Sequence, residues 1–280
     1  MYNYMNFLSK IIAKFFFTSV LFFIALYSHA QSAANMVRIN SGTFLMGSPN
    51  TESRRFSNEN QRQVSLSPFY MGRYEVTQAE FQDIMGINPS HFQGPNLPVE
   101  NVSWFDAIEF CNRLSIREGL RPAYTIDGTQ VSWDRNANGY RLPTEAEWEF
   151  SSRAGTTTPF STGADITSDE ANFNGNHPYI VDNPPGVYRG TTVPVGSFAP
   201  NAFGLYDMHG NVGEWCWDWN VVYSAREETN PSGPATGFYR VFRGGSWNHP
   251  ADFLRSARRG GNLPNTRVFF LGFRLARNAF

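Results

Sequence analysis

The stretch that most constrains the fold is residues 201–219, with the sequence NAFGLYDMHGNVGEWCWDW. Two carboxylates, Asp207 and Glu214, flank a segment that holds two glycines and an asparagine, which accept sharply turned backbone. Large aromatic side chains lie on both sides of this segment, and burying them requires a sizeable core. The stretch therefore predicts a tight polar turn over an aromatic core. These aromatic residues are Phe203, Tyr206, Trp215, Trp217 and Trp219.

The residues of this turn allow two interpretations. Carboxylate oxygens, together with backbone carbonyls that the glycines turn inward, would form an all-oxygen cage suited to Ca²⁺. Alternatively, Asp207 and Glu214 accept hydrogen bonds from backbone amides in a tight turn that holds no ion. The stretch has fewer acids than an EF-hand loop and a different spacing, so the residues alone leave both open.

Composition favours one loop-rich α+β domain and excludes several function classes. The chain has 280 residues with 24 Gly and 17 Pro, which favours many turns and few long regular elements. The 25 Phe, 12 Tyr and 7 Trp supply an aromatic core. A net charge of −1 without a basic run argues against a nucleic-acid partner. The sequence also lacks a nucleophile elbow, a P-loop and a dinucleotide-binding glycine motif.

The first 30 residues are typical of a secretory signal peptide. Lys10 and Lys14 supply the positive region, and the apolar run at 15–27 is too short to span a bilayer. The small residue Ala30 predicts cleavage before Gln31, which leaves residues 31–280 as the mature domain. We therefore expect an extracytoplasmic protein, in the periplasm, on the cell surface or secreted, without a stable membrane span after cleavage. An uncleaved anchor is the alternative.

The chain has two cysteines, Cys111 and Cys216. In an oxidising compartment they could form a disulfide. Cys111 lies on an apolar helix face and Cys216 lies among tryptophans, so two separately buried thiols are the alternative. Without a CxxC pair, and with five scattered histidines, a zinc site is not expected.

Local patterns predict the regular elements. We expect short strands at 36–39 and 44–46, and strand structure over 64–77 with a bend at Pro68. The polar stretch 48–63 is expected to be a loop, and residues 155–200, rich in Gly, Pro, Asn, Ser and Thr, are expected to be mostly irregular.

N-terminal caps predict three helices. Thr77 with Glu80, and Thr144 with Glu147, have the spacing of capping boxes, and Ser103 is the expected cap of a helix that Gly119 ends. The three acids Glu145, Glu147 and Glu149 lie along the start of the last helix. We interpret them as cap and solvent-facing residues rather than as a catalytic group.

Seven pieces of the chain, in order, resemble the sulfatase-modifying-factor family, whose best-known members are the formylglycine-generating enzymes. The resemblance implies the formylglycine-generating-enzyme fold, a variant of the C-type lectin-like fold. It also implies a structural calcium ion bound by the side chains of Asp207 and Glu214 and by the carbonyls of Gly210 and Val212. The pieces are SGTFLMGS at 41–48, YEVTQAEF at 74–81, PVENVSWFDAIEFCNRLS at 98–115, YRLPTEAEWEFSSRAG at 140–155, NAFGLYDMHGNVGEW at 201–215, RVFRGGSW at 240–247 and LGFRLAR at 271–277.

The same resemblance argues against the family's best-known reaction. Those enzymes oxidise a cysteine of a sulfatase peptide to formylglycine with copper held by two cysteines shortly after the GGS motif. The matching positions here are His249 and Leu254, and no cysteine follows Cys216. Because Cu(I) prefers soft thiolate ligands, formylglycine formation is not expected.

The segment 248–270 resembles a variable region. Between Asn248 and Arg274 there is no Lys, Gln, Glu, Met or Trp. These five types are the ones that cannot be reached by changing the two adenines of an Asn codon, AAY. The segment is therefore similar to the variable regions of proteins diversified by adenine-directed retroelements, which use the same scaffold. The alternative is an ordinary structural C-terminus with Phe269 and Phe270 in the core.

The favoured hypothesis is a non-catalytic binding module that recognises a protein or another surface ligand through this segment, because exposed aromatic and arginine side chains are typical of binding hot spots. We expect its side chains to form one exposed patch. One alternative is an oxidoreductase-type modifying enzyme of this family whose site does not use cysteine. A structural envelope component is the other. The predicted ligand-binding residues are His249, Asp252, Phe253, Leu254, Arg258, Leu263, Val268, Phe269 and Phe270.

Overall fold

The computed structural model describes residues 35–222 and 226–279. The chain forms two compact units, residues 1–36 and residues 37–280. The fold and the candidate site described below lie in the second unit. The predicted signal peptide, residues 1–30, lies outside the described residues. Among the helices that are described, none has the length and apolar character needed to cross a membrane.

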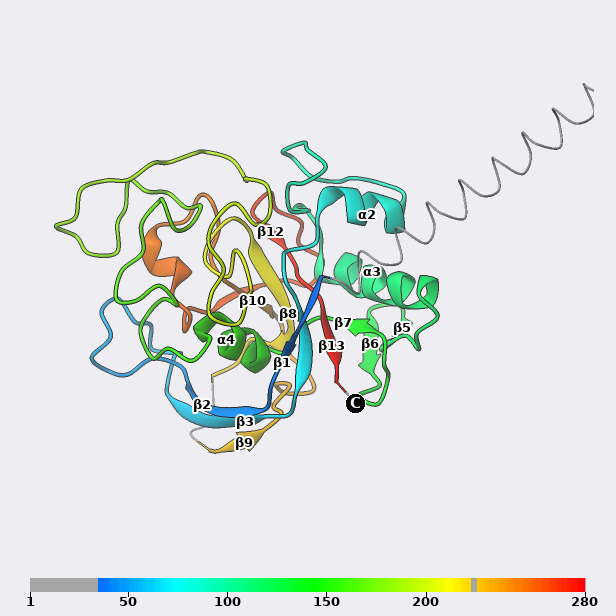
Figure 1. Ribbon diagram of the computed structural model, residues 1–280. Helices are drawn as coiled ribbons and strands as arrows, with labels where there is room; N and C mark the ends of the chain where they lie inside the picture. Colours follow the sequence, from blue (N-terminus) through cyan, green and yellow to red (C-terminus); the bar gives the residue numbers. More distant parts are fainter. Residues whose placement is uncertain (1–34, 223–225, 280) are drawn as a thin grey trace, which may run out of the picture. The chain divides into compact units, whose positions relative to one another are not determined.

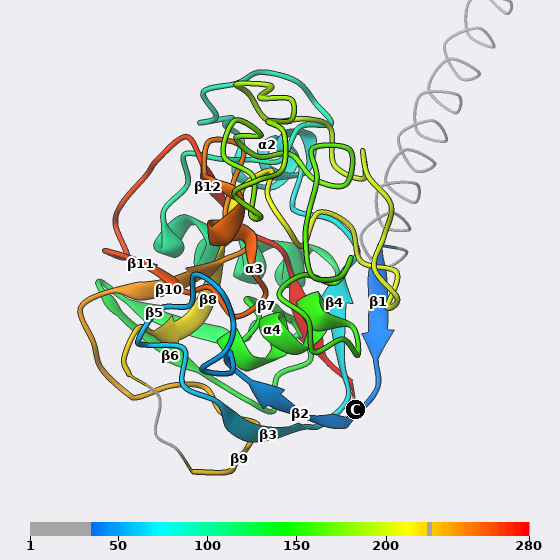
Figure 2. The same cartoon turned by 90° about the vertical axis from the view of Figure 1, so that its left-hand side faces the viewer.

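Short strands form four small sheets (Figures 1 and 2). Their orders are β1-β4-β13-β7, β11-β10-β8-β12, β2-β3-β9 and β5-β6. The strands are β1 (Met36–Ile39), β2 (Gly42–Met46), β3 (Arg62–Leu66), β4 (Phe69–Gly72), β5 (Tyr124–Asp127), β6 (Gln130–Trp133), β7 (Tyr140–Arg141), β8 (Gly213–Trp219), β9 (Glu228–Thr229), β10 (Arg240–Arg243), β11 (Gly260–Asn262), β12 (Leu271–Gly272) and β13 (Ala276–Asn278). The predicted strand over 64–77 is divided at Pro68 into β3 and β4, as expected from a bend there.

Strand β8 follows the turn at residues 207–211. Asp207, Gly210 and Asn211 have φ of 55°, 88° and 57°, the left-handed region that Gly and Asn accept most readily. Immediately after it, β8 pairs antiparallel with β10 and parallel with β12. The indole of Trp215 is fully buried and donates to the carbonyl of Val102 at 3.0 Å, so its polar edge is satisfied in the core. The predicted turn over an aromatic core is confirmed.

The three predicted helix starts are also confirmed. Helix α2 (Gln78–Met85) begins at Thr77, α3 (Trp104–Arg117) at Ser103 and α4 (Glu145–Arg153) at Thr144. At each start the cap side chain and the residue three positions later satisfy each other's backbone amides. Helices α2 and α3 lie next to each other in both views (Figures 1 and 2).

The solvent-facing role expected for the acids of α4 is wrong. Glu145 and Glu149 are 2% and 0% exposed, and Glu147, although it is the expected cap partner, is also buried. Glu147 accepts two hydrogen bonds from Arg141, and the other two acids bind Arg243 and Arg259 from distant parts of the chain. Burial of these carboxylates is possible because each has a cationic partner.

The region 155–200 contains none of the helices or strands named above, as predicted, and runs as loops over the molecule (Figure 1). A hydrophobic cluster under part of it holds Phe160, Ile166, Phe173 and Tyr179. Cys111 and Cys216 are both free and buried, so the interpretation as two separate thiols is confirmed. The loop-rich α+β class with few regular elements is confirmed as well.

Candidate ligand-binding surface

The C-terminal segment doubles back on the scaffold just after β10. Gly244 and Gly245 have φ of 91° and 69°, and a short 3₁₀ helix, η1 (Ala251–Leu254), follows. A Cβ on Gly245 would lie 2.9 Å from the carbonyl oxygen of Phe253 and 2.7 Å from the Leu254 side chain. Only glycine therefore allows the chain to turn this closely against η1.

Two buried arginines tie this segment to the core. Arg255 is fully buried and donates to both carboxylate oxygens of Glu59, at 2.8 and 2.9 Å, and to Glu52 at 2.6 Å. Arg259 binds both carboxylate oxygens of Glu145, at 2.7 and 2.8 Å. Such bidentate pairs fix both position and orientation. The segment is thus tied to the loop before β3 and to the first turn of α4.

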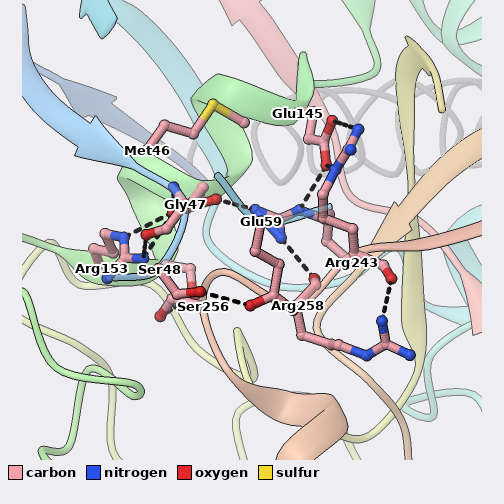
Figure 3. Close-up of polar contacts among 12 residues, drawn as sticks. Met46, Gly47, Ser48, Glu59, Glu145, Arg153, Arg243, Ser256 and Arg258 are labelled. Atoms are coloured by element: carbon pink, nitrogen blue, oxygen red, sulfur yellow. Dashed lines mark hydrogen bonds and ion pairs between the residues drawn. The ribbon is translucent and has the colours of Figure 1, made fainter. Parts of the chain in front are cut away.

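Arg243 of β10 extends the same network. Its guanidinium contacts Glu149 and Glu145, and its Nη1 also donates to the backbone carbonyl of Arg258 at 2.6 Å (Figure 3). Arg153, on α4, binds Glu149 and the carbonyl of Gly47, so the network reaches β2. We call this set the buried arginine network: Arg153, Arg243, Arg255 and Arg259 with Glu52, Glu59, Glu145 and Glu149.

On the other side of the segment, aromatic side chains form a continuous series of ring contacts. Most of these side chains are partly exposed. His249 stacks on Phe253 with a centroid distance of 4.9 Å and meets Phe270 edge-on at 5.1 Å. Phe270 contacts Phe269 at 5.9 Å, and Phe269 contacts Trp247 at 5.8 Å. Ring centroids 4.5–7 Å apart are the range of favourable aromatic pairs.

Other parts of the chain lengthen this series at both ends. Phe56, in the polar loop before β3, contacts Phe253 at 6.3 Å. At the other end Tyr188 stacks with Trp247 at 6.1 Å, and His91 lies 5.9 Å from Phe269. We call the whole set the aromatic band: Phe56, His91, Phe92, Tyr188, Trp247, His249, Phe253, Phe269 and Phe270.

The predicted ligand-binding residues divide into two groups. Four of them lie in the aromatic band, and Arg258 stacks against it on Phe253. Phe269 is 43% exposed, whereas His249, Phe253, Phe270 and Arg258 are half-buried. The others take no part in these ring contacts. Of these, Asp252 and Val268 are half-buried, Leu263 is 47% exposed beyond β11, and Leu254 is fully buried.

The expectation that Leu254 belongs to an exposed patch is therefore wrong. Its side chain packs in the hydrophobic cluster with Phe160 and Phe173, below η1. Its carbonyl accepts a 2.7 Å hydrogen bond from Nδ1 of the buried His209, whose Nε2 accepts from the amide of Ser161. A 3₁₀ helix turns by about 120° per residue, so Leu254 points into this cluster while Phe253 lies at its edge, half-buried.

Sequence reasoning missed five members of the band: Phe56, His91, Phe92, Tyr188 and Trp247. They lie outside the segment 248–270, and their positions beside it depend on contacts between distant parts of the chain. Phe56 carried a signal, because it is the one aromatic residue in the polar stretch 48–63. Phe56 and Tyr188 are 39% and 41% exposed, and an exposed aromatic in a polar loop is a candidate contact residue.

The positions that match the two catalytic cysteines of the formylglycine-generating enzymes hold His249 and Leu254. Neither side chain has a thiol, so this pair cannot bind a metal as two thiolates would. Nδ1 of His249 lies 2.7 Å from the hydroxyl of Ser246. Burial, together with the charge of Arg258, lowers the pKa of His249 to about 4, so its ring is neutral at physiological pH. The thiols of Cys111 and Cys216 lie elsewhere in the core, where burial raises their pKa values.

The predicted calcium ligand Glu214 is engaged by protein donors. Its two carboxylate oxygens accept from Nε and Nη2 of Arg274, each at 2.6 Å, and one of them also accepts from the indole of Trp148 at 2.6 Å. All three side chains are buried. A carboxylate bound in this way has little free capacity for a further ligand.

Asp207 differs from Glu214 in that one of its oxygens is free. Its Oδ2 accepts from the amide of Gly196 at 2.6 Å, whereas Oδ1 is buried without a hydrogen-bond partner in the part of the chain that the structure describes. Burial, together with the charge of Glu214, raises the pKa of Asp207 to about 6 against the opposing effects of Gly196 and Arg274. An unpartnered buried carboxylate oxygen fits a hard cation.

A third carboxylate, which sequence reasoning missed, lies in the same cluster. Glu75 accepts from the side chain of Asn211 at 2.7 Å and from the amide of Val212 at 3.1 Å. Burial, followed by the charges of Asp207 and Glu214, raises the pKa of Glu75 well above its usual value. Within residues 35–222 and 226–279, no three His, Cys, Asp or Glu side chains form a group that could hold a metal ion. The calcium site stays a prediction.

A cavity of about 460 Å³ lies away from the aromatic band. It is lined by β3, the end of β8, β9 and the loop at 230–234. Arg62, Glu145, Asp218 and Arg259 contribute its charged walls, and none of the predicted ligand-binding residues lines it.

Comparison with known proteins places the chain in a family. Residues 25–279 match the family described as "Sulfatase-modifying factor enzyme 1-like domain". The chain belongs to the sulfatase-modifying factor family. The predicted fold, that of the formylglycine-generating enzymes, is therefore confirmed.

Three relatives show the range of this family. The chaperone protein LppX of Paenibacillus barcinonensis is 39% identical over 236 residues, which cover 76% of this chain and 78% of that protein. The formylglycine-generating enzyme of Mus musculus is 30% identical, with 86% and 74% covered. The solved structure of Treponema denticola variable protein 1 matches with a TM-score of 0.78 and 35% identity, covering 87% of this chain and 95% of that one. The chain is thus a member of the family that lacks the catalytic cysteine pair and is similar to a variable protein.

Proposed function

We propose that this protein is a secreted or surface-exposed member of the sulfatase-modifying factor family that binds a protein ligand through the aromatic band without transforming it. The observation that carries the proposal is the division of the C-terminal segment into two faces. Arg255 and Arg259 anchor one face in the core, while on the other Phe269 is 43% exposed and Phe253 is half-buried at the edge of a hydrophobic cluster. A rigid support beneath partly exposed aromatic side chains limits the entropy lost on binding.

The residue types of the aromatic band and the names of two relatives support a binding role. Aromatic and arginine side chains carry most of the energy in protein interfaces, and the band combines nine rings with Arg258 beside Phe56 and Phe253. One relative is named as a chaperone and a solved relative as a variable protein. Chaperones as a class bind other proteins. The name 'variable protein' is consistent with a contact surface whose residues change.

The proposal includes no enzymatic activity. In this chain the positions of the copper-binding cysteines hold a neutral histidine and a core leucine, and thiolates are the ligands that Cu(I) prefers. An extracytoplasmic location is part of the proposal and is supported by the leader-like composition of residues 1–30.

A structural calcium ion at Asp207 is also part of the proposal. The feature that supports it is Oδ1 of Asp207, which is buried without a hydrogen-bond partner among the described residues. The carbonyls of Gly210 and Val212 would complete the set of oxygen ligands. The ion would stabilise the turn before β8 and take no part in ligand binding.

Site-specific photocrosslinking tests the binding role. p-Benzoylphenylalanine replaces Phe269 in the chain from residue 31 onward, and the matched control carries it at Ile116, a 65% exposed position on α3 outside the band. After irradiation with an envelope extract of the source organism, we expect a crosslinked protein from position 269 and none from position 116. The captured protein, once purified, should bind the unmodified chain and bind Phe269→Ala more weakly. Equal crosslinking from both positions would contradict the proposal.

A further inference from the structure

Arg258 has an unusual environment in the segment 248–270. Its guanidinium carbon lies 3.5 Å from the ring centroid of Phe56 and 4.4 Å from that of Phe253. The guanidinium therefore stacks against two aromatic rings, which favours a cation but leaves its in-plane N–H groups as the only groups able to bind a partner. The residue as a whole is half-buried.

Those N–H groups are incompletely used. Nη1 donates to the carbonyl of Arg259 at 2.9 Å, and Nε is buried without a hydrogen-bond partner. Within the described ranges, 35–222 and 226–279, Arg258 makes no ion pair. Burial lowers the pKa of Arg258, the charges of Arg255 and Arg243 act in the same direction, and the charges of Glu59 and Asp252 oppose them. Among the described residues, Arg258 is thus a cation with N–H groups that no carboxylate contacts directly.

The neighbouring acids are committed to other arginines. Glu59 binds Arg255 through both oxygens, and Asp252 lies 3.6 Å from the guanidinium of Arg54. Arg258 therefore has no direct contact with either carboxylate, although both lie near enough for their charges to act on it. A partly buried charge without a partner destabilises the folded chain, and an opposite charge delivered by a ligand would remove that penalty.

We propose that Arg258 is a specificity-determining residue that binds the carboxylate of an aspartate or glutamate side chain on the protein ligand. The proposal rests on the proposed function, because it names the chemistry that the same surface selects. The ligand carboxylate would lie in the plane of the guanidinium, and the apolar part of the ligand would lie along Phe253 and the rest of the band.

A carboxylate fits this site better than a phosphate or a sulfate. Both arginine and carboxylate are planar, so they pair edge to edge in the one direction that the rings leave accessible. A tetrahedral dianion would bring a second negative charge near Glu59 and Asp252, whose charges already act on Arg258.

Selection of peptides on the immobilised chain tests the proposal. A phage-displayed library of random peptides is selected on the chain from residue 31 onward, and the enriched peptides are synthesised and titrated against five proteins. These are the unmodified chain, Arg258→Gln, Arg258→Lys, Arg54→Gln and Phe269→Ala. Arg54→Gln is the matched control, because Arg54 lies in the same cluster and already has Asp252 as its partner.

We expect enriched peptides that carry Asp or Glu and that lose about tenfold or more in affinity for Arg258→Gln, since hydrogen bonds to charged groups are the stronger class. Arg258→Lys should restore part of the loss, and Arg54→Gln should change affinity by less than about twofold. Replacing the peptide acid by its amide should weaken binding to the unmodified chain and leave binding to Arg258→Gln unchanged.

Other results would overturn the inference. If peptides depend on Phe269 but not on Arg258, the carboxylate proposal fails and the proposed function stands. If no selected peptide depends on either residue, both fail. If sulfotyrosine peptides or heparin bind through Arg258 while carboxylate peptides do not, the ligand chemistry is wrong. Arg258→Gln should keep the thermal unfolding midpoint within a few degrees, and a large drop would instead indicate a structural role.

Discussion

Arg255 and Glu59 form two hydrogen bonds, at 2.8 and 2.9 Å, between groups 196 positions apart in the chain. Both side chains are fully buried. Through this pair the loop before β3 and the segment after η1 are held together, and the same loop carries Phe56 to its place beside Phe253. The contact surface is therefore assembled from two distant segments by a buried ion pair beneath it.

The first prediction concerns this pair. Arg255→Met removes the cation and leaves Glu59 and Glu52 buried without it. We expect the free energy of unfolding to fall by about 3–5 kcal/mol, the range for breaking one side of a buried pair. Urea unfolding followed by tryptophan fluorescence measures the change. Arg258→Met in the same segment is the control, and we expect it to change stability by less than about 1 kcal/mol, because Arg258 lacks a carboxylate partner among the described residues.

The second prediction separates binding from stability at Phe269. This side chain is 43% exposed, so Phe269→Ala should reduce the free energy of unfolding by less than about 1 kcal/mol. If it belongs to the hot spot, the affinity for the captured ligand should fall by about 2 kcal/mol or more. Calorimetric titration measures the affinity, and urea unfolding measures the stability. An unchanged affinity would remove Phe269 from the site.

The third prediction concerns calcium. If the ion binds at Asp207, adding CaCl₂ to chelator-treated protein should raise the unfolding midpoint in a concentration-dependent way, because a ligand that binds only the folded state stabilises it by mass action. Asp207→Asn should abolish the shift, since it removes the carboxylate with the free Oδ1. MgCl₂ is the control ion, which demands a stricter octahedral geometry. The same midpoint with calcium and with chelator would show that the turn is held by protein contacts alone.

The sequence predicted those parts of the fold whose causes are local. A capping box at Thr77 or Thr144 depends on side chains three positions apart, and the turn before β8 depends on Gly210 and Asn211 themselves. The sequence gives no sign that Glu145 and Glu149 are buried, because their partners Arg259 and Arg243 are 94 or more positions away. A charged residue is normally exposed, and only the distant partner reverses that expectation.

The candidate site was predictable to the extent that it lies on one segment. Arg258 and Arg255 are three positions apart and equivalent by residue type, yet one is stacked beside Phe56 and the other is fully buried against Glu59. Phe253 and Leu254 differ in the same way. Which neighbour points outward is set by the 3₁₀ turn and by the loops that pack on it, and neither is encoded by periodicity in this segment.

The fourth prediction follows from a buried carboxyl at the cavity. Burial, followed by the charge of Glu145, raises the pKa of Asp218 to about 7. The folded state therefore keeps this proton at pH values where the unfolded chain has lost it, so this group's contribution is fully present below about pH 4 and is lost as the pH rises to about 7. Asp218→Asn keeps an acceptor for the amide of Glu145 and removes the titration.

We expect the variant to be more stable than the unmodified chain by about 2 kcal/mol or more at pH 8, since each pKa unit corresponds to about 1.4 kcal/mol. The difference should shrink toward pH 5. Urea unfolding across this pH range measures it, and a constant difference at all pH values would contradict the role of this proton.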